Sequence, residues 1–391
     1  MECEVILQIF SGGFSGNAVH YDEVEKKLLS VLPILPVRKV IMGWAPDKAI
    51  YARTAEFLAK KNIDFFLWFP VFSETGAFRQ LDPLVDLYGA PLENVRSQTA
   101  EDFSFCCPNN PQNIERILDI FESEFTSICF SGVFLDKIRY PSFAQGQQSV
   151  FSCFCPHCLK EYKTKKFEAL HLKNVLSRPA SSPLGITSYP GNGEYAFSEN
   201  DVSRFFSLKA GFIFQSMRQI CAFFRERGLK IGFDVFAPYL SPFVGQNLPV
   251  LSSLCDFIKP MMYRITHAPA GLPFEMEALL RQTGSVDSAK RQFFYDVLGF
   301  DPGKKDFDLD FAVKELSALS SSSACPVYAG VEINRKKDLA EVYPDYIEET
   351  ILAYARTGIQ GFVLSWDLLS MPAENLIRTG EVMKKINNNF L

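Results

Sequence analysis

Eight short apolar runs recur along the chain of 391 residues, and a longer segment of helical character follows each of them. Every run is nearly continuous in hydrophobicity, which is typical of parallel strands that are buried on both faces. The runs predict strands at Glu4–Phe10, Arg38–Gly43, Asp64–Phe69, Phe130–Asp136, Lys230–Ala237, Asp256–Met262, Pro326–Ile333 and Gly361–Trp366.

The segments between the runs predict eight helices, several of which carry start signals. Asp47 precedes one helix, and Asn110 followed by Pro111 opens another; a capping side chain and a proline in the first turn both favour a helix start. The predicted helices are Asp22–Val31, Lys48–Lys61, Pro111–Phe125, Asp201–Arg227, Pro249–Leu254, Leu309–Ser320, Tyr343–Thr357 and Pro372–Ile386. Eight strand–helix units predict an α/β fold, a (β/α)8 TIM barrel, with residues 1–391 as a single catalytic domain.

A doubly wound sheet is the alternative architecture. It usually carries a glycine-rich first turn that holds a phosphate group. Here the first run continues as FSGGFSG at residues 10–16, which has neither the dinucleotide-binding spacing nor the P-loop spacing. The barrel is therefore favoured, and the glycine-rich run is interpreted as a loop.

A minimal barrel takes about 250 residues, so roughly 140 residues of this chain belong to insertions. Three long segments can hold them: residues 70–110 after the third predicted strand, 138–200 after the fourth and 264–308 after the sixth. The second of these contains a cysteine-rich loop insertion at about 141–200. All three follow the carboxyl ends of strands, which is the face on which barrel enzymes carry their active sites.

Composition excludes several classes of protein. The net charge is −5 and no basic block occurs, so nucleic acid is not an expected partner. No run of about 18 apolar residues exists, so no membrane span is predicted, and residues 1–10 lack the basic start of a signal peptide. Ten Cys without an export signal predict a cytoplasmic protein with free or metal-bound thiols. The oligomeric state is open, and a homo-oligomer is compatible with the sequence.

Three carboxylates occupy the inward register near the carboxyl ends of predicted strands. Asp136 ends the fourth strand, Asp234 lies on the fifth and Glu332 lies on the seventh. In each strand a glycine two or four residues earlier shares the face of the carboxylate, because side chains alternate along a strand. The missing side chain predicts room in the barrel mouth. We therefore expect Asp136, Asp234 and Glu332 to converge on one cavity.

Carboxylates that share a cavity can divide the work of cleaving a glycosidic bond. One stays ionised as nucleophile or base, and another is held protonated and donates its proton. The alternative is that one or more of them form ion pairs inside the barrel. The basic residues near enough in sequence to supply partners are Lys137, Arg139, Lys259 and Arg264.

Aromatic and polar residues at the same strand ends favour a sugar substrate. Trp44, Trp68 and Trp366 lie at or near strand ends, and an aromatic face packs well on the apolar face of a pyranose. Core packing is the other interpretation, above all for Trp68. The remaining candidates for substrate contacts are Arg139, Tyr140, Lys259, Tyr263, Asp367 and Asn109.

The stretch CFCPHC at residues 153–158 packs three thiols and an imidazole into six residues. Its CxxC element is the usual half of a structural zinc site, whereas the spacing does not match that of ferredoxin clusters. The predicted zinc ligands are Cys153, Cys155, Cys158 and His157, with Cys106 or Cys107 as alternatives for the fourth position. Unligated thiols are the other interpretation.

Lys259 on the sixth predicted strand offers a different chemistry. A desolvated lysine can form a Schiff base with a carbonyl substrate, as in barrel aldolases. The interpretation that we favour is an ion pair with Asp234 or Asp136. No GxSxG element occurs, which disfavours serine hydrolysis.

Several of these motifs resemble those of one group of barrels. The stretch GVFLDKIRYP at residues 132–141 resembles the strand motif of glycoside-hydrolase-like TIM barrels broadly related to the α-galactosidase superfamily, many of them uncharacterised. The segments 234–238, 256–263 and 365–367 look similar to the same group. The resemblance covers most of the chain, and it implies a glycosidase-type barrel with Asp136 at the centre of the chemistry.

The resemblance also implies where a second carboxylate should lie. In the α-galactosidase group the fourth strand carries the nucleophile and the sixth carries the acid, but this sequence has Met262, Tyr263 and Arg264 there. That leaves Asp234 or Glu332 as the partner. Another large glycosidase clan uses the fourth and seventh strands, which would suit Asp136 with Glu332.

The sequence thus predicts a glycoside hydrolase that acts on a small glycoside or oligosaccharide through paired carboxylates, with a retaining mechanism favoured. No catalytic cofactor is expected. A retaining enzyme separates its carboxyl groups by about 5–5.5 Å and an inverting one by roughly 6.5–9.5 Å. A Schiff-base lyase using Lys259 and a non-catalytic carbohydrate-binding barrel are the alternatives.

Overall fold

The computed structural model describes residues 3–11, 19–45, 47–73, 77–92, 95–96, 102–176, 183–284, 287–304 and 306–389. At its centre lies one sheet of eight parallel strands in the order β10-β9-β6-β3-β2-β1-β14-β11. These strands are β1 (Glu4–Phe10), β2 (Val37–Gly43), β3 (Asp64–Pro70), β6 (Gly132–Asp136), β9 (Lys230–Val235), β10 (Phe257–Pro260), β11 (Tyr328–Glu332) and β14 (Gly361–Ser365). All eight predicted strands are confirmed, with bounds that differ by a few residues.

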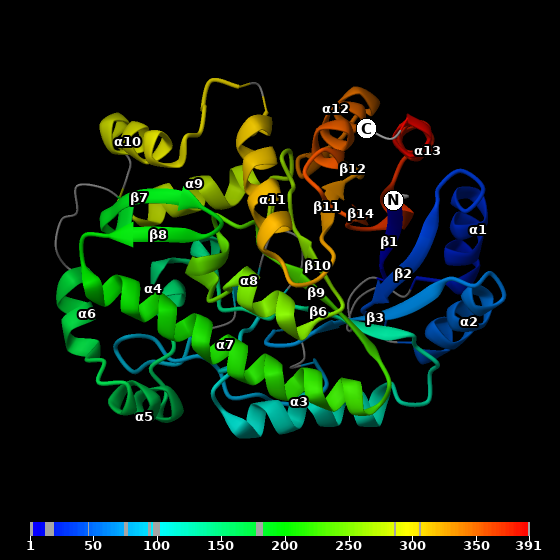
Figure 1. Ribbon diagram of the computed structural model, residues 1–391. Helices are drawn as coiled ribbons and strands as arrows, with labels where there is room; N and C mark the ends of the chain where they lie inside the picture. The colour runs from blue at the N-terminus through cyan, green and yellow to red at the C-terminus, as the bar shows by residue number, and fades with distance from the viewer. Residues whose placement is uncertain are drawn as a thin grey trace.

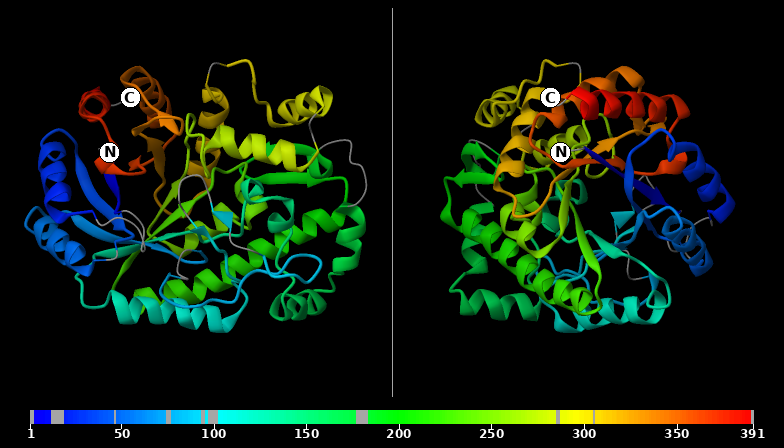
Figure 2. Two further views of the ribbon diagram at one scale, coloured as in Figure 1. Left: turned by 180° about the vertical axis from the view of Figure 1, so that it is seen from behind. Right: turned by 45° about the vertical axis from the view of Figure 1, so that its right-hand side comes forward.

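The sheet closes into a barrel between its two outer strands, β10 and β11. Two isolated parallel bridges join them, one between Ile258 and Val327 and one between Met261 and Gly330. The helices surround the strands on the outside (Figures 1 and 2). The predicted (β/α)8 barrel is confirmed, and the doubly wound alternative is wrong because such a sheet stays open at its edges.

A helix follows each barrel strand, as predicted. These helices are α1 (Tyr21–Val31), α2 (Lys48–Ala59), α3 (Pro111–Glu124), α7 (Asn200–Glu226), α8 (Leu248–Leu251), α11 (Leu309–Ser322), α12 (Pro344–Ala355) and α13 (Ala373–Asn389). Both predicted caps form, because the side chains of Asp47 and Asn110 accept hydrogen bonds from backbone N–H groups in the first turns of α2 and α3. Within the described residues, no helix is both long enough and apolar enough to cross a membrane.

The three predicted insertions follow β3, β6 and β10. The first holds β4 (Val95–Arg96) and β5 (Asp102–Phe103), and the third holds α9 (Leu272–Gln282) and α10 (Ser288–Leu298). The second holds η2 (Phe143–Gln145), α4 (Gln147–Val150), α5 (Pro156–Thr164), α6 (Ala169–Leu176), η3 (Pro183–Gly185), β7 (Ile186–Gly191) and β8 (Glu194–Phe197). The second and third insertions meet where the β7–β8 hairpin lies beside α10 (Figure 1).

Shorter elements complete the chain. They are η4 (Ser241–Val244), η5 (Ser252–Leu254), β12 (Arg335–Lys336), β13 (Ala340–Glu341) and η6 (Leu368–Ser370). Most of the predicted glycine-rich loop, at residues 12–18, lies outside the described residues.

The barrel interior is a packed core with a polar layer at each end. Large apolar side chains fill its middle, among them Phe66, Phe134 and Phe257. Near the amino-terminal end, Lys39 pairs with Glu4 at 3.1 Å. The carboxyl-terminal end holds the carboxylates and is described below. The filled interior follows the rule for eight-stranded barrels, which enclose side chains rather than a channel.

The three glycines that precede the predicted carboxylates do not leave open space, which corrects that expectation. A methyl group added at Gly132 would lie 2.4 Å from the Phe66 ring, and one at Gly232 would lie 2.2 Å from the Phe257 ring. At Gly330 it would lie 2.5 Å from Cε of Lys259. Large side chains from neighbouring strands therefore occupy the room, because cores pack to crystal-like density.

Replacing Gly232 by Ala should lower the free energy of unfolding by about 1–3 kcal/mol, because overpacking forces neighbouring groups to shift. Urea unfolding measures the change. Gly211→Ala in α7 is the control: no atom outside the backbone of the helix lies within 4 Å of the new methyl group, and the higher helix propensity of Ala should stabilise the protein by up to about 1 kcal/mol. Equal stability of the two variants would contradict the packing at Gly232.

Candidate active site

A cavity lies at the carboxyl-terminal mouth of the barrel, where the strand ends converge. Seven of the residues predicted from the sequence line it: Asp136, Asp234, Arg139, Trp68, Tyr263, Trp366 and Asp367. The lining residues that were not predicted as substrate contacts include Gln8, Phe10, Phe103 and Lys336. Gln8 had a sequence signal, since it is a polar residue inside the apolar run of β1, whereas Phe103 belongs to an insertion whose path the sequence does not indicate.

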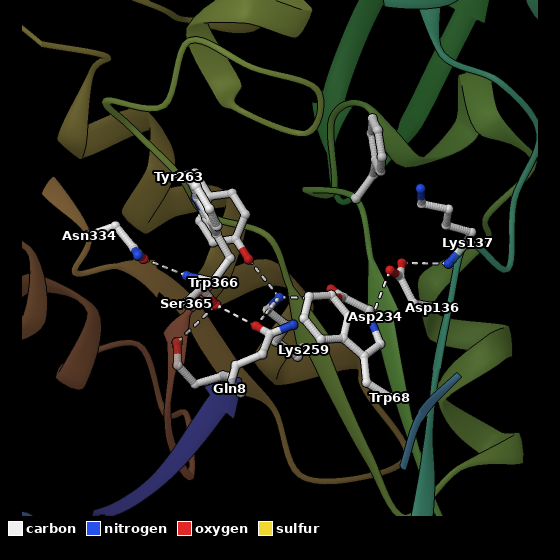
Figure 3. A network of polar contacts seen from close by, with 12 residues as sticks. Gln8, Trp68, Asp136, Lys137, Asp234, Lys259, Tyr263, Asn334, Ser365 and Trp366 are labelled. Atoms are coloured by element: carbon white, nitrogen blue, oxygen red, sulfur yellow. Dashed lines mark hydrogen bonds and ion pairs between the residues drawn. The ribbon is translucent and has the colours of Figure 1, made fainter. Parts of the chain in front are cut away.

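Asp136 ends β6, and two N–H donors hold its carboxylate. Its Oδ2 accepts a hydrogen bond from Nε1 of Trp68 at 3.0 Å, and its Oδ1 accepts one from the backbone N of Lys137 at 2.5 Å. Figure 3 shows both contacts. N–H donors aimed at both oxygens are complementary to a carboxylate and fix its orientation toward the cavity.

Asp234 lies on β9 at the level of Asp136. The ladder between β6 and β9 pairs Leu135 with Phe233, so the residues that follow them, Asp136 and Asp234, are level with each other. The ladder between β9 and β10 pairs Asp234 with Lys259. Three charged residues therefore stand side by side on adjacent strands.

Lys259 is the centre of a buried polar network (Figure 3). Its ammonium donates to Oδ2 of Asp234 at 2.9 Å, to the hydroxyl of Tyr263 at 2.6 Å and to Oε1 of Gln8 at 3.4 Å. The same Gln8 oxygen accepts from Ser365 at 3.1 Å. The other oxygen of Asp234, Oδ1, is buried without a hydrogen-bond partner among the described residues.

Burial and neighbouring charges set the proton affinities in this network. Burial raises the pKa of Asp234 to about 7 against the opposing effect of Lys259, and the nearby Asp136 carboxylate also raises it. Burial by itself would lower the pKa of Lys259, but Asp234 and Tyr263 outweigh it and raise that pKa to about 12. Lys259 therefore keeps its proton near neutral pH, while Asp234 can gain or lose one.

Aromatic rings form one wall of the site. The rings of Phe10 and Trp44 lie 5.4 Å apart at their centroids, and those of Trp44 and Trp68 lie 5.5 Å apart. Phe10 and Trp68 line the cavity, whereas Trp44 lies behind them and is not among the lining residues. On the other side, Trp366 lines the cavity with Lys336 over its ring at 5.5 Å.

Two buried cations follow Asp136 along the chain. The ammonium of Lys137 lies 4.2 Å from the centroid of the Phe103 ring, and this residue adopts a φ of 50°, which few residues other than glycine do. The guanidinium of Arg139 donates to the carbonyl of Tyr140 at 2.9 Å and lies 4.4 Å from the centroid of the Phe236 ring. Backbone in sparsely populated regions is common at functional sites.

Glu332 is not among the residues that line the cavity, so only two of the three predicted carboxylates share it. Its Oε1 accepts from the backbone N of Ile265 at 2.6 Å, in the segment that follows β10. Oε2 has no hydrogen-bond partner among the described residues. Burial raises the pKa of Glu332 to about 7. The alternation of side chains along β11 predicts that Glu332 faces the barrel interior. Because Glu332 ends its strand, however, its side chain can turn toward the loop that follows a neighbouring strand.

Three other predicted contacts have different surroundings. Tyr140 is buried beneath Lys209, whose ammonium lies 4.2 Å from the centroid of its ring. Nδ2 of Asn109 donates to Sγ of Cys158 at 3.3 Å, so this side chain belongs to the cysteine cluster. Asp367 lines the cavity, but its carboxylate caps η6 by accepting from Leu369 N at 3.1 Å.

The cysteine cluster is a compact group of four sulfur atoms. Cys107, Cys153, Cys155 and Cys158 are all buried, and their Sγ atoms lie within 4.8 Å of one another. Sγ of Cys107 lies 3.5 Å from Sγ of Cys155 and 3.5 Å from Sγ of Cys158. His157 is exposed at the start of α5 and is not part of this group. The fourth sulfur of the group is that of Cys107, because the first insertion folds against the second.

No protein-family model matches the chain, and no curated protein matches it in sequence. Among solved structures, it is similar to the glycoside hydrolase domain of PgaB (BpsB) from Bordetella bronchiseptica, with 10% identity, a TM-score of 0.60 and coverage of 98% of this chain and 99% of that one. It is also similar to alpha-L-fucosidase isoenzyme 2 from Paenibacillus thiaminolyticus, with 10% identity and a TM-score of 0.52.

The second comparison covers 99% of this chain but 49% of the fucosidase. At this level of identity the likeness concerns the fold, which is the barrel type found in glycoside hydrolases. The finer relationship to the α-galactosidase superfamily stays a prediction from the sequence motifs.

Replacing Glu332 by Gln should stabilise the protein at pH 8 and have a smaller effect at pH 5. The folded protein holds the Glu332 proton up to about pH 7, whereas the unfolded chain releases it near 4.3. Stability from this group is thus present at low pH and is lost as the pH rises from about 4 to 7. Gln mimics the protonated form, so the gain at pH 8 is on the order of 1–3 kcal/mol.

Urea unfolding at the two pH values measures the effect. Glu226→Gln on the exposed face of α7 is the control, and it should not alter the difference between pH 5 and pH 8. A loss of stability in Glu332→Gln at pH 8 would show that the ionised form is favoured in the folded protein.

Proposed function

We propose that the protein is a glycoside hydrolase that acts on a small glycoside or oligosaccharide, with Asp136 and Asp234 as its carboxylate pair. The observation that carries the proposal is the placement of these two side chains, level with each other on adjacent strands, in a cavity walled by aromatic rings. The similarity to a domain described as a glycoside hydrolase domain and to a fucosidase agrees with it.

The surroundings of the two carboxylates suit different roles. Two N–H donors orient the Asp136 carboxylate for action at the anomeric carbon as nucleophile or base. Asp234, with a pKa raised to about 7 by burial, suits the general acid that protonates the leaving oxygen. Its unpartnered Oδ1 is the atom that would hold the transferable proton, because Oδ2 accepts from Lys259.

The strand register favours a retaining mechanism. Adjacent strands lie about 4.8 Å apart, so side chains that are level on β6 and β9 start from nearly that separation. This is closer to the spacing of about 5–5.5 Å in retaining enzymes than to the roughly 6.5–9.5 Å of inverting ones. Asp136 would then form the glycosyl–enzyme intermediate.

The cavity wall suits a sugar ring. Trp68, Trp366 and Phe10 offer apolar faces for the C–H face of a pyranose. Arg139 and Tyr263 add polar groups at the edge, where ring hydroxyls would lie. Trp44 supports this wall from behind through its ring contacts with Phe10 and Trp68.

The surroundings of Lys259 disfavour the Schiff-base alternative. Attack on a carbonyl needs a neutral amine, but Asp234 and Tyr263 hold the pKa of Lys259 at about 12. Removal of the proton would also leave Asp234 buried without a counter-charge, which is strongly unfavourable. We therefore assign Lys259 to positioning Asp234 rather than to covalent chemistry.

Asp136→Asn and Asp234→Asn should each lower kcat by about 10²–10⁴-fold on the glycoside that the wild type cleaves, because general acid–base groups contribute about that much. A panel of α- and β-linked aryl glycosides and disaccharides identifies that glycoside. Wild-type kcat should fall as the pH rises through about 7, since deprotonated Asp234 cannot donate. Circular dichroism checks that each variant is folded.

Glu332→Gln is the matched control, and its kcat should stay within a few-fold of the wild type because Glu332 lies outside the cavity lining. A loss in Glu332→Gln with full activity in Asp234→Asn would overturn the proposed pair. Sugar binding in calorimetry without any product would favour the carbohydrate-binding barrel, and a borohydride-trapped adduct lost in Lys259→Met would favour the lyase.

We also propose that the cysteine cluster binds one structural zinc ion. Tetrahedral zinc with Zn–S bonds of about 2.3 Å places its sulfur ligands about 3.8 Å apart, close to the 3.5 Å between Cys107 and its two neighbours. Two N–H donors point at the sulfurs, from Val85 N to Cys153 at 3.2 Å and from Asn109 to Cys158 at 3.3 Å. Such contacts suit thiolates rather than thiols.

The position of the cluster explains what the metal would do. It joins the first insertion, through Cys107, to the second, through the other three cysteines. Four zinc-bound thiolates would carry a net charge of −2, and the fully buried Lys209 interacts electrostatically with Cys153 and Cys158. Zinc would therefore fasten the two insertions to each other.

Wild-type protein purified without chelator should hold about one zinc per chain, and Cys107→Ser should lose it, because three thiolates in this arrangement leave the tetrahedral site incomplete. Elemental analysis measures the metal, and a thermal scan should show a lower Tm for Cys107→Ser. His157→Ala is the matched control and should keep both the zinc and the Tm. Loss of zinc in His157→Ala, with zinc retained in Cys107→Ser, would instead favour His157 as the fourth ligand.

A further inference from the structure

A second pair of cysteines lies at the opposite end of the barrel, away from the cavity and from the four-cysteine cluster. Sγ of Cys255 and Sγ of Cys325 are 3.6 Å apart. Cys255 comes just before β10 and Cys325 just before β11, so both lie at the amino-terminal ends of these strands. No local pattern in the sequence predicts this pair, because 70 residues separate its members.

The pair lies at the joint where the barrel closes. The strands that follow the two cysteines, β10 and β11, meet through isolated bridges rather than through a continuous ladder. Near the pair, the backbone N of Ile258 donates to the carbonyl of Pro326 at 3.0 Å, and Ala324 N donates to Ser252 Oγ at 2.9 Å. These contacts hold the two segments together and bring the two sulfur atoms close to each other.

The two thiols differ in access and in reactivity. Cys255 is buried, with 6% of its surface exposed, whereas Cys325 is half-buried and can be reached from solvent. Contact with the Cys255 thiol lowers the pKa of Cys325, and the Ser323 hydroxyl adds to this effect. Burial raises the pKa of Cys255. An accessible thiol of lowered pKa beside a second thiol is the arrangement of an attacking and a resolving cysteine.

We infer that Cys325 and Cys255 form a site of reversible thiol–disulfide exchange, which takes a low-molecular-weight disulfide of the glutathione class and becomes a disulfide across the β10–β11 joint. The inference is independent of the proposed glycosidase activity and of the zinc site, because it uses none of their residues.

The exchange balances in two steps. The Cys325 thiolate attacks one sulfur of oxidised glutathione, whose S–S bond breaks; one glutathione leaves with the bonding electron pair and takes up the proton that Cys325 lost. Cys255 then loses its proton and attacks Sγ of Cys325, and the second glutathione leaves as a thiol. In total the two protein thiols give up two electrons and two protons, and the glutathione disulfide receives them.

The new bond would fasten the joint at which the barrel closes. A disulfide stabilises chiefly by restricting the unfolded chain, and the effect grows with the length of the loop that it closes. The loop here spans 70 residues and contains the whole third insertion. The sulfurs, 3.6 Å apart in this structure, must approach to about 2.05 Å to form the bond.

The test uses the full chain, purified with its native metal content and then incubated with oxidised glutathione. Remaining thiols are alkylated, and peptide mapping by mass spectrometry finds the linked residues. The expected result is a peptide pair joined through Cys255 and Cys325, loss of two alkylatable thiols and a rise of a few degrees in Tm that reducing agent reverses.

Two variants make the outcome decisive. Cys255→Ser should stop at the mixed disulfide, with glutathione retained on Cys325, whereas Cys129→Ser, which removes a single exposed thiol, should still form the bond. Alkylation of both thiols in the wild type after full incubation would overturn the inference. So would a wild type that stops at the mixed disulfide, since Cys255 would then not act as the resolving thiol.

Discussion

The ion pair between Lys259 and Asp234 is the interaction on which the candidate site depends. Both side chains are almost fully buried inside the barrel, and an unpaired charge at such a place would cost several kcal/mol. The pair exists because the ladder between β9 and β10 sets the two residues at one level. It needs Gly330 as well, since a methyl group there would collide with the Lys259 side chain.

The same register argument extends to Asp136 and explains why two carboxylates of different character lie on adjacent strands of the cavity. Asp136 is level with Asp234, at the end of its strand, and is oriented by Trp68. Asp234 is level with Lys259 on the next strand, and its Oδ1 has no hydrogen-bond partner among the described residues. Parallel strands that close into a barrel bring these positions together without any long loop. The chemistry that we propose thus rests on the barrel strands rather than on the loops.

The insertions add what the barrel itself cannot supply. The first brings Phe103 to the cavity wall and Cys107 to the sulfur cluster, within five residues of chain. The second leaves the cavity at Arg139 and reaches the same cluster at Cys153. A metal bound there would therefore fix the far ends of two segments whose near ends form the wall of the site. This link connects the two proposals physically, although each can be tested alone.

The sequence by itself determined the barrel, because strand burial, helix periodicity and the caps at Asp47 and Asn110 are local properties. It also placed Asp136 and Asp234 in the mouth, since alternation along a strand is local too. Tertiary structure decided that Glu332 turns toward the backbone of Ile265 and that glycine positions are filled by neighbouring side chains.

Tertiary structure also decided which sulfur atoms meet. The fourth member of the cluster is Cys107 rather than His157, and Cys255 meets Cys325 across the closing joint of the barrel. The physical reason is the same in both cases. The contacting cysteines are far apart in sequence, by 46 positions from Cys107 to Cys153 and by 70 from Cys255 to Cys325. Only the packing of loops and the closure of the sheet bring them together.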